Sequence, residues 1–206
     1  METLKETSRR RPIQERGKER YQMIIEATTK LVGERGNDDV SIRDIAKQAN
    51  VAPSSIYQYF HDKNDIIIAI MQDYFDRNYT LLKTVTSSAT TLSEWINALD
   101  ITIEYFFDRI KNDPGWATIW SGIQASPVLR DIDNEDAMRN ANLLQGQLLL
   151  HCPHVKRAEA LSACIMLVQL AAVTAKMALF TDKEMGSELI EEYKRIVRMR
   201  IKSIAV

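Results

Sequence analysis

Apolar residues recur at helical spacing along most of this chain. Between residues 14 and 36 they stand at Met23, Ile24, Ala27, Leu31 and Val32, and a helix of 3.6 residues per turn places them on one face. No segment alternates apolar and polar residues over the length of a strand. The pattern therefore predicts an all-α protein of about nine helices.

Turn residues separate the expected helices. Long helices are expected at 14–36, 62–84, 91–111, 135–151, 155–180 and 184–204, with two short helices inside 41–60 and one around Trp116 and Trp120. Gly36 closes the first helix, and "NDPG" at 112–115 is a strong turn. The helix around Trp116 and Trp120 is expected to give way at "ASP" and the acidic "DIDNED", before the next helix begins at residue 135.

The two short helices in "SIRDIAKQANVAPSSIYQYF" (41–60) are too short to be stable alone. Ser41 and Asp44 are spaced as a capping-box variant, Asn50 tolerates the left-handed conformation of a tight turn, and Pro53 suits a first helical turn. The segment predicts a helix-turn-helix, and its second helix would present an outward polar face to a DNA major groove.

The helix at 155–180 is apolar nearly all round its axis, so it must be covered on all sides. The last helix carries a matching stripe that includes Met185, Leu189 and Ile196. We expect both helices to pack against their copies in a homodimer through residues 155–204. A membrane span is not expected, because Gln169, Thr174 and Lys176 interrupt the apolar run.

The composition fits a globular protein, with 206 residues, 45% of them hydrophobic and 27% charged. The net charge is −1, but "RRR" and "RGKER" concentrate positive charge near the N-terminus. Two cysteines and no apolar N-terminal run indicate a cytoplasmic protein. "HCPH" (151–154) is interpreted as a helix end; no metal site and no cofactor are predicted.

Motifs typical of enzymes are not found: there is no phosphate loop, dinucleotide fingerprint, nucleophile elbow or zinc-ligand spacing. No catalytic residue is therefore predicted, and the protein is not expected to be an enzyme. A helical interaction protein without DNA binding is an alternative, although it would not need an outward face containing Tyr57 and Lys63.

The run "GERGNDDVSIRDIAKQANVAPSSIYQYFHDKNDII" resembles the N-terminal domain of the tetracycline-repressor (TetR) family of regulators. Gly36, "SIRDIA", "VAPSS", "IYQYF" and Lys63 carry the resemblance, which covers about residues 18–70. It implies a flexible basic arm at 1–13, a helix-turn-helix domain at 14–62, and a ligand-binding and dimerisation domain at 63–206.

The resemblance also implies roles for residues of the helix-turn-helix. Ser41 and Lys63 would bind phosphates, and Tyr57 a phosphate or a thymine methyl group. Pro53, Ser54, Ser55, Gln58 and Tyr59 are candidates for base-edge and sugar contacts, with Arg43 and His61 beside them. The basic residues Arg9, Arg10, Arg11, Arg16, Lys18 and Arg20 would either add DNA contacts or remain solvated.

The resemblance further implies an inducer pocket among the middle helices. Its candidate lining residues are Trp95, Tyr105, Phe106, Trp116, Trp120, Met138, Met166 and Gln169. The expected protein is a regulator, a repressor before an activator, that binds a palindromic operator in double-stranded DNA as a homodimer and is released by a small-molecule inducer.

Overall fold

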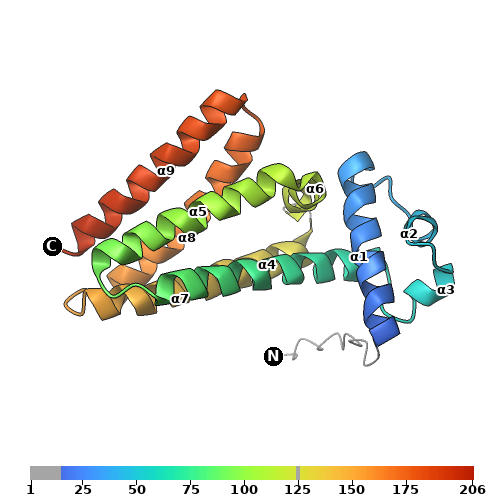
Figure 1. The fold of residues 1–206 in the computed structure, drawn as a ribbon, viewed down its shortest axis with the longest axis horizontal. Helices are drawn as coiled ribbons and strands as arrows, with labels where there is room; N and C mark the ends of the chain where they lie inside the picture. The colour runs from blue at the N-terminus through green and yellow to red at the C-terminus, as the bar shows by residue number, and fades with distance from the viewer. Residues whose placement is uncertain (1–14, 124–125) are drawn as a thin grey trace. The chain divides into compact units, whose positions relative to one another are not determined.

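The computed structural model describes residues 15–123 and 126–206, and over these ranges the chain is helical without strands (Figure 1). The helices are α1 (Glu15–Arg35), α2 (Ile42–Gln48), α3 (Pro53–Ile56), α4 (Lys63–Ser87), α5 (Leu92–Asn112), α6 (Pro114–Gly122), α7 (Pro127–His151), α8 (Arg157–Leu179) and α9 (Lys183–Ile204). The predicted all-α class is confirmed. The predicted arm at 1–13 lies outside the described residues.

The chain divides into two compact units by its internal contacts. The first contains α1 to α3, α4 as far as Asp73, and α6; the second contains the rest of α4 together with α5, α7, α8 and α9. By contacts the boundary thus falls inside α4 rather than at residue 62, and α6 joins the unit of the helix-turn-helix although the sequence interpretation assigned it to 63–206.

Two glycines explain why α6 packs in the first unit. A Cβ atom on Gly33 of α1 would lie 2.8 Å from the backbone nitrogen of Gly115, and a Cβ atom on Gly115 would collide with the carbonyl oxygen of Thr29. The α1 and α6 backbones therefore approach each other more closely than side chains allow. Trp116 and Trp120 are buried in this unit.

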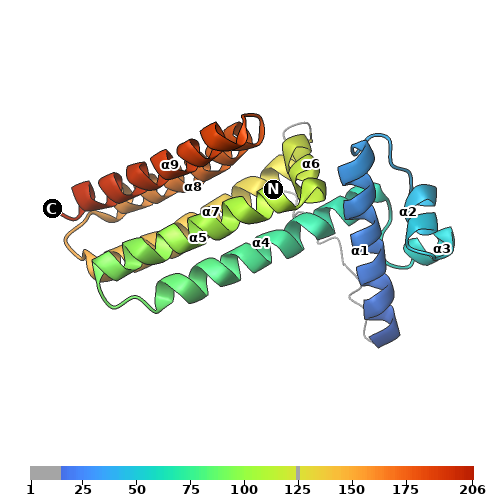
Figure 2. The same ribbon diagram turned by 45° about the horizontal axis from the view of Figure 1, so that its top comes forward.

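In the second unit α9 packs on α8 and α5. Figures 1 and 2 show α8 and α9 side by side along their length. The Tyr193 hydroxyl donates to the Leu167 carbonyl oxygen over 2.8 Å, and Arg198 Nη2 lies 2.6 Å from Asp100 Oδ2. These contacts hold the last helix to both neighbours.

Two helices differ from the sequence prediction. α7 begins at Pro127, so the expected interruption through "DIDNED" is wrong. Ser126 is the N-cap, with its hydroxyl accepting from Leu129 N, and Pro127 occupies the first turn; a Ser-Pro pair that suggested a break instead starts the helix. α3 is a single turn that ends at Ile56, so Tyr57 and Gln58 follow this helix, whereas the sequence predicted that the helix itself presents the outward polar face.

One helix of the described residues, α8, is long and apolar enough to cross a membrane by length and composition. The core helix of a globular protein passes the same test; α8 packs along α7 and α9, but only 28% of its apolar window is buried within the chain.

Candidate functional site

The start of α2 is fixed by a reciprocal cap. Asp44 N donates to Ser41 Oγ over 3.2 Å, and Ser41 N donates to Asp44 Oδ2 over 3.0 Å. The Ser41 hydroxyl also bonds the same carboxylate. These hydrogen bonds from Ser41 lower the pKa of Asp44 below its usual value. The predicted capping box is confirmed, and it sets the direction in which α2 leaves the preceding loop.

The turn between α2 and α3 has the predicted conformation. Asn50 has a φ of 53°, in the left-handed region, and Val51 N donates to the Ala46 carbonyl oxygen over 3.0 Å. Pro53 occupies the first turn of α3, and Ala52 at the N-cap makes no side-chain hydrogen bond. A rigid corner therefore presents α3 to solvent.

The residues after this corner separate into inner and outer faces. Ile56 and Phe60 are buried, whereas Tyr57 is 58% exposed and Gln58 is exposed. Tyr59 is half-buried, with its ring centroid 6.3 Å from that of Tyr21 on α1. The outer face thus consists of polar groups and one free aromatic ring.

α4 begins with a second cap, and Lys63 lies in its first turn. Asp65 N donates to Asp62 Oδ1 over 3.0 Å, and His61 N donates to Asp65 Oδ2 over 2.9 Å. Lys63 Nζ donates to the Asn37 carbonyl oxygen over 2.5 Å, so it ties the α1–α2 loop to α4. Sequence reasoning missed this internal bond because the two residues are far apart in the chain.

The other predicted DNA-binding residues lie around the same corner. Pro53, Ser54, Arg43 and His61 are exposed and Ser55 is half-buried. In residues 15–123 and 126–206 no hydrogen-bond or ion-pair partner is present for the side chains of Arg43, Tyr57, Gln58 and His61. Lys18 and Arg20 are exposed on α1, whereas Arg9, Arg10 and Arg11 lie outside the described residues.

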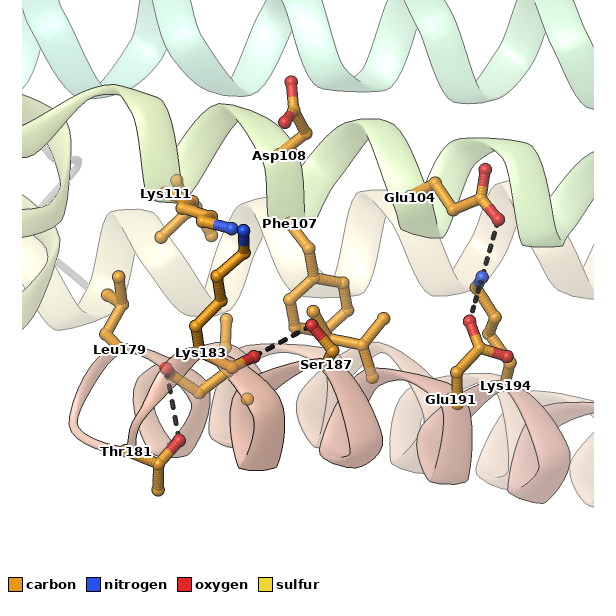
Figure 3. Close-up of a pocket in the computed structure, with 15 residues that line it drawn as sticks. Glu104, Phe107, Asp108, Lys111, Leu179, Thr181, Lys183, Ser187, Glu191 and Lys194 are labelled. Carbon is orange, nitrogen blue, oxygen red and sulfur yellow. Dashed lines mark hydrogen bonds and ion pairs between the residues drawn. The ribbon is translucent and has the colours of Figure 1, made fainter.

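The second unit contains a pocket of about 510 Å³ between α5, α8 and α9 (Figure 3). Its apolar lining includes Phe107, Ile110 and Ala175, which are buried. At one end Lys194 Nζ lies 2.6 Å from Glu104 Oε1 and 2.7 Å from Glu191 Oε1. Burial alone would lower the pKa of Lys194, but its hydrogen bonds with Glu104 and Glu191 raise it.

None of the eight predicted ligand-site residues lines this pocket. Trp95 is buried, and its indole N–H donates to Gln147 Oε1 over 3.0 Å. Trp116 and Trp120 belong to the first unit. Tyr105, Met138 and Met166 are exposed, and Phe106 and Gln169 are half-buried. The resemblance implied a pocket among the middle helices, but residue type alone does not show which side chains surround empty space.

The segment "HCPH" ends α7 as predicted. α7 ends at His151, and Cys152 N donates to the Leu148 carbonyl oxygen over 2.8 Å. Cys152 and Cys164 are buried free thiols, and burial raises the pKa of Cys164 to about 12.

The capped corner, the exposed face after Pro53 and the helical second unit define the class of helix-turn-helix proteins. Residues 24–70 match the model of the tetR family of bacterial regulatory proteins, and residues 93–203 match the tetracycline repressor-like C-terminal domain. The chain therefore belongs to the TetR family.

Relatives extend the comparison. The HTH-type transcriptional regulator HbdR of Aromatoleum is 43% identical over 28% of this chain and 25% of its own length. The fatty acid metabolism regulator protein of Bacillus subtilis is 28% identical over 63% of this chain and 66% of its own. The chain thus spans a quarter to two-thirds of the length of these curated relatives.

Solved structures share the fold. FadR from Bacillus subtilis, in complex with stearoyl-CoA, aligns with a TM-score of 0.70 at 22% identity, covering 88% of this chain and 97% of FadR. A TetR-family transcriptional regulator from Streptomyces coelicolor aligns with the same TM-score and identity, over 90% of this chain and 99% of its own.

Proposed function

We propose that this protein is a ligand-responsive transcriptional regulator, a repressor that binds a palindromic DNA operator as a homodimer and is released by a small-molecule inducer. The observation that carries the proposal is the exposed face after the α2–α3 corner, where Tyr57, Gln58 and His61 have no side-chain partner in the described chain. A rigid corner with free polar groups fits a major groove.

The roles within this face follow from the chemistry of each group. Gln58 has an amide that can pair with adenine N6 and N7, and Tyr57 offers a hydroxyl and a ring to a phosphate or a thymine methyl group. Arg43 is a free cation for phosphate. Lys63 has three N–H donors, one of which bonds Asn37, and the others remain for phosphate. Ser41, Pro53, Ser54, Ser55, Tyr59 and His61 complete the proposed contacts.

The homodimer is proposed to form through an apolar patch on α8 and α9. Its members are large apolar residues that are at least two-fifths exposed: Met166, Val173, Met177, Phe180, Met185, Ile196 and Met199. Met166, Val173 and Met177 of α8 and the C-cap Phe180 follow one another at intervals of 7, 4 and 3 residues. These intervals place the four side chains on one face of the helix. Apolar patches of this kind mark interaction sites, and two copies of the α8–α9 pair would form a four-helix interface.

The ligand is proposed to bind in the second unit. FadR of Bacillus subtilis was solved with stearoyl-CoA, and the multidrug binding protein EbrR was solved with malachite green. The pocket between α5, α8 and α9 supports this placement better than the eight residues suggested with the family resemblance, because it is an open volume with charged groups at its ends.

The remaining parts of the proposal follow from the family. A regulator that binds operator DNA works in the cytoplasm of a bacterium, and we assign it no catalytic activity.

Selection of binding sites from random duplexes by the purified protein tests the function. We expect a palindrome with two half-sites, bound by two copies of the chain. Its presence near the protein's own coding region would favour repression of that region. Enrichment of no sequence would overturn the proposal and favour a helical interaction protein.

A further inference from the structure

The ends of the α5–α8–α9 pocket differ in charge. In Figure 3 Lys194 lies between Glu104 and Glu191 at one end, and both pairs are ion pairs. At the other end the Lys183 side chain extends from α9 toward α5 and points toward that of Lys111. The three paired groups at one end therefore carry a net charge of −1, and the other end gathers two positive charges.

Among the residues that the structure describes, neither lysine of the positive end has a carboxylate partner. Lys111 and Lys183 make no ion pair or side-chain hydrogen bond within residues 15–123 and 126–206. Asp108 also borders the pocket, but its carboxylate points away from α9 (Figure 3) and accepts a hydrogen bond from Asn112 Nδ2 over 2.8 Å. Two ammonium groups that approach each other repel, and an anion between them would remove that repulsion.

The lining between the two ends is mainly apolar. Phe107 and Ile110 of α5 and Ala175 of α8 are buried, and Leu179 and Ile190 line the same volume. The volume of about 510 Å³ lies within the usual range for small-molecule sites. An apolar lining with a cationic end is complementary to a molecule with one anionic end and an apolar body.

We propose that this pocket binds an anionic amphiphile, with its carboxylate, sulfate or phosphate between Lys111 and Lys183 and its apolar body along Phe107 and Ile110. The carboxylates of Glu104 and Glu191 exclude the anionic group from the opposite end, so the ligand has one orientation. The proposal deepens the proposed function by naming a ligand class, and rests on that function only for the ligand's effect on DNA binding.

The pocket and the apolar patch of α8 and α9 share no residue. The pocket uses the sides of these helices that neighbour α5, and the patch uses other faces. Ligand binding and the proposed dimer are therefore compatible.

Calorimetric titration of the full chain with decanoate, below its micelle concentration, tests the site. Decyltrimethylammonium has the same chain with a cationic head, and we expect it to bind at least about tenfold more weakly than decanoate. The double variant Lys111→Gln/Lys183→Gln should weaken decanoate binding about tenfold or more. The matched variant Lys156→Gln/Lys202→Gln removes two charges from exposed positions outside the pocket and should change it little.

A blocking variant tests the location. Ser187 is exposed and lines the pocket, so Ser187→Trp should fill it and abolish decanoate binding while leaving the helical circular dichroism unchanged. Decanoate binding that survives Ser187→Trp, or that falls equally in both double-lysine variants, would overturn the assignment. So would equal affinity for the two amphiphiles.

Titration of the selected operator separates this proposal from the proposed function. If the protein binds the operator but has no affinity for decanoate, the pocket assignment is wrong and the proposed regulatory function stands. A protein that binds decanoate as expected but no operator retains the pocket and loses the regulatory function.

Discussion

The exposed polar face after the α2–α3 corner and the apolar patch of α8 and α9 consist of opposite kinds of side chain. The first presents Tyr57, Gln58 and His61, whose side-chain polar atoms have no partner among the described residues. The second presents groups such as Phe180, which is 82% exposed, and Met199, which is 71% exposed. Free donors and acceptors suit a hydrated polar partner, and bare methylene groups suit another protein surface.

The two surfaces are also held in place by different means. Around α3 the fixed points are local: the Ser41–Asp44 and Asp62–Asp65 caps, in which side chains bond nearby backbone groups, and the turn at Asn50. Beneath the α8–α9 patch they are buried side chains such as Val197 and the ion pairs of Lys194. Substitutions at the first surface should therefore alter recognition, whereas substitutions at the second should alter assembly.

The largest effect is expected at the apolar patch. Met177 is 50% exposed on α8, and Met177→Glu would place an unpaired carboxylate from each copy in the proposed interface. A buried uncompensated charge costs about 3–5 kcal/mol, so the dimer should dissociate at micromolar concentration in sedimentation experiments.

Leu150→Glu is the matched control, because Leu150 is 81% exposed but lies on α7, outside the patch. It should leave the dimer unchanged. If both variants stay dimeric, the two chains meet elsewhere.

The next effect concerns Asp136 of α7. Burial raises the pKa of Asp136 to about 6, although Arg139 acts to lower it. Because the native carboxyl binds its proton more tightly than the unfolded one, its contribution to stability is greatest below about pH 4 and is lost as the pH rises through 6. Asp136→Asn has no charge to bury. The free energy of unfolding of Asp136→Asn minus that of the wild type should therefore increase by about 2–3 kcal/mol between pH 4 and pH 7.

Denaturant titrations of both proteins across this pH range measure the difference. The opposite slope would mean that the 2.7 Å pair of Asp136 with Arg139 outweighs burial and keeps the carboxylate ionised.

At the polar face Gln58→Ala should cost roughly 1–3 kcal/mol of binding to the selected operator, mostly through one base pair in each half-site. Binding to random DNA should change little, because phosphate contacts supply it. Gln48→Ala removes the same side chain from an exposed position at the end of α2 and is the control. Equal weakening on every duplex would make Gln58 a backbone contact.

Local signals in the sequence predicted the first surface well. The Ser41–Asp44 cap, the left-handed Asn50 and the place of Pro53 in a first helical turn each depend on residues within a few positions of one another. The start of α7 was misread because Ser-Pro is both a turn signal and a helix start. The pair starts a helix only where the residues after Pro127 are themselves helical, as they are in α7.

Long-range features could not be predicted from the pattern. Gly33 and Gly115 are separated in the chain by α2, α3, α4 and α5, yet they bring α6 against α1. Lys111 and Lys183 likewise meet only because α9 packs beside α5. Periodicity identifies the face of a helix that is buried, but it does not identify the helix that covers that face.

The smallest effect is expected at the α2–α3 turn, where it tests whether the backbone sets the polar face. Asn50 has a φ of 53°, a conformation that costs a residue with a Cβ atom about 1–2 kcal/mol unless its side chain bonds locally, and that glycine adopts freely. Asn50→Ala should therefore be about 1 kcal/mol less stable to denaturant than Asn50→Gly. Gln48, two residues earlier, ends the right-handed helix α2, where alanine is the better residue by up to about 1 kcal/mol. The order of the alanine and glycine variants should thus reverse between positions 48 and 50. If the alanine variant is more stable than the glycine variant at both positions, the turn relaxes without a left-handed residue. The backbone of the turn would then not hold the polar face in place.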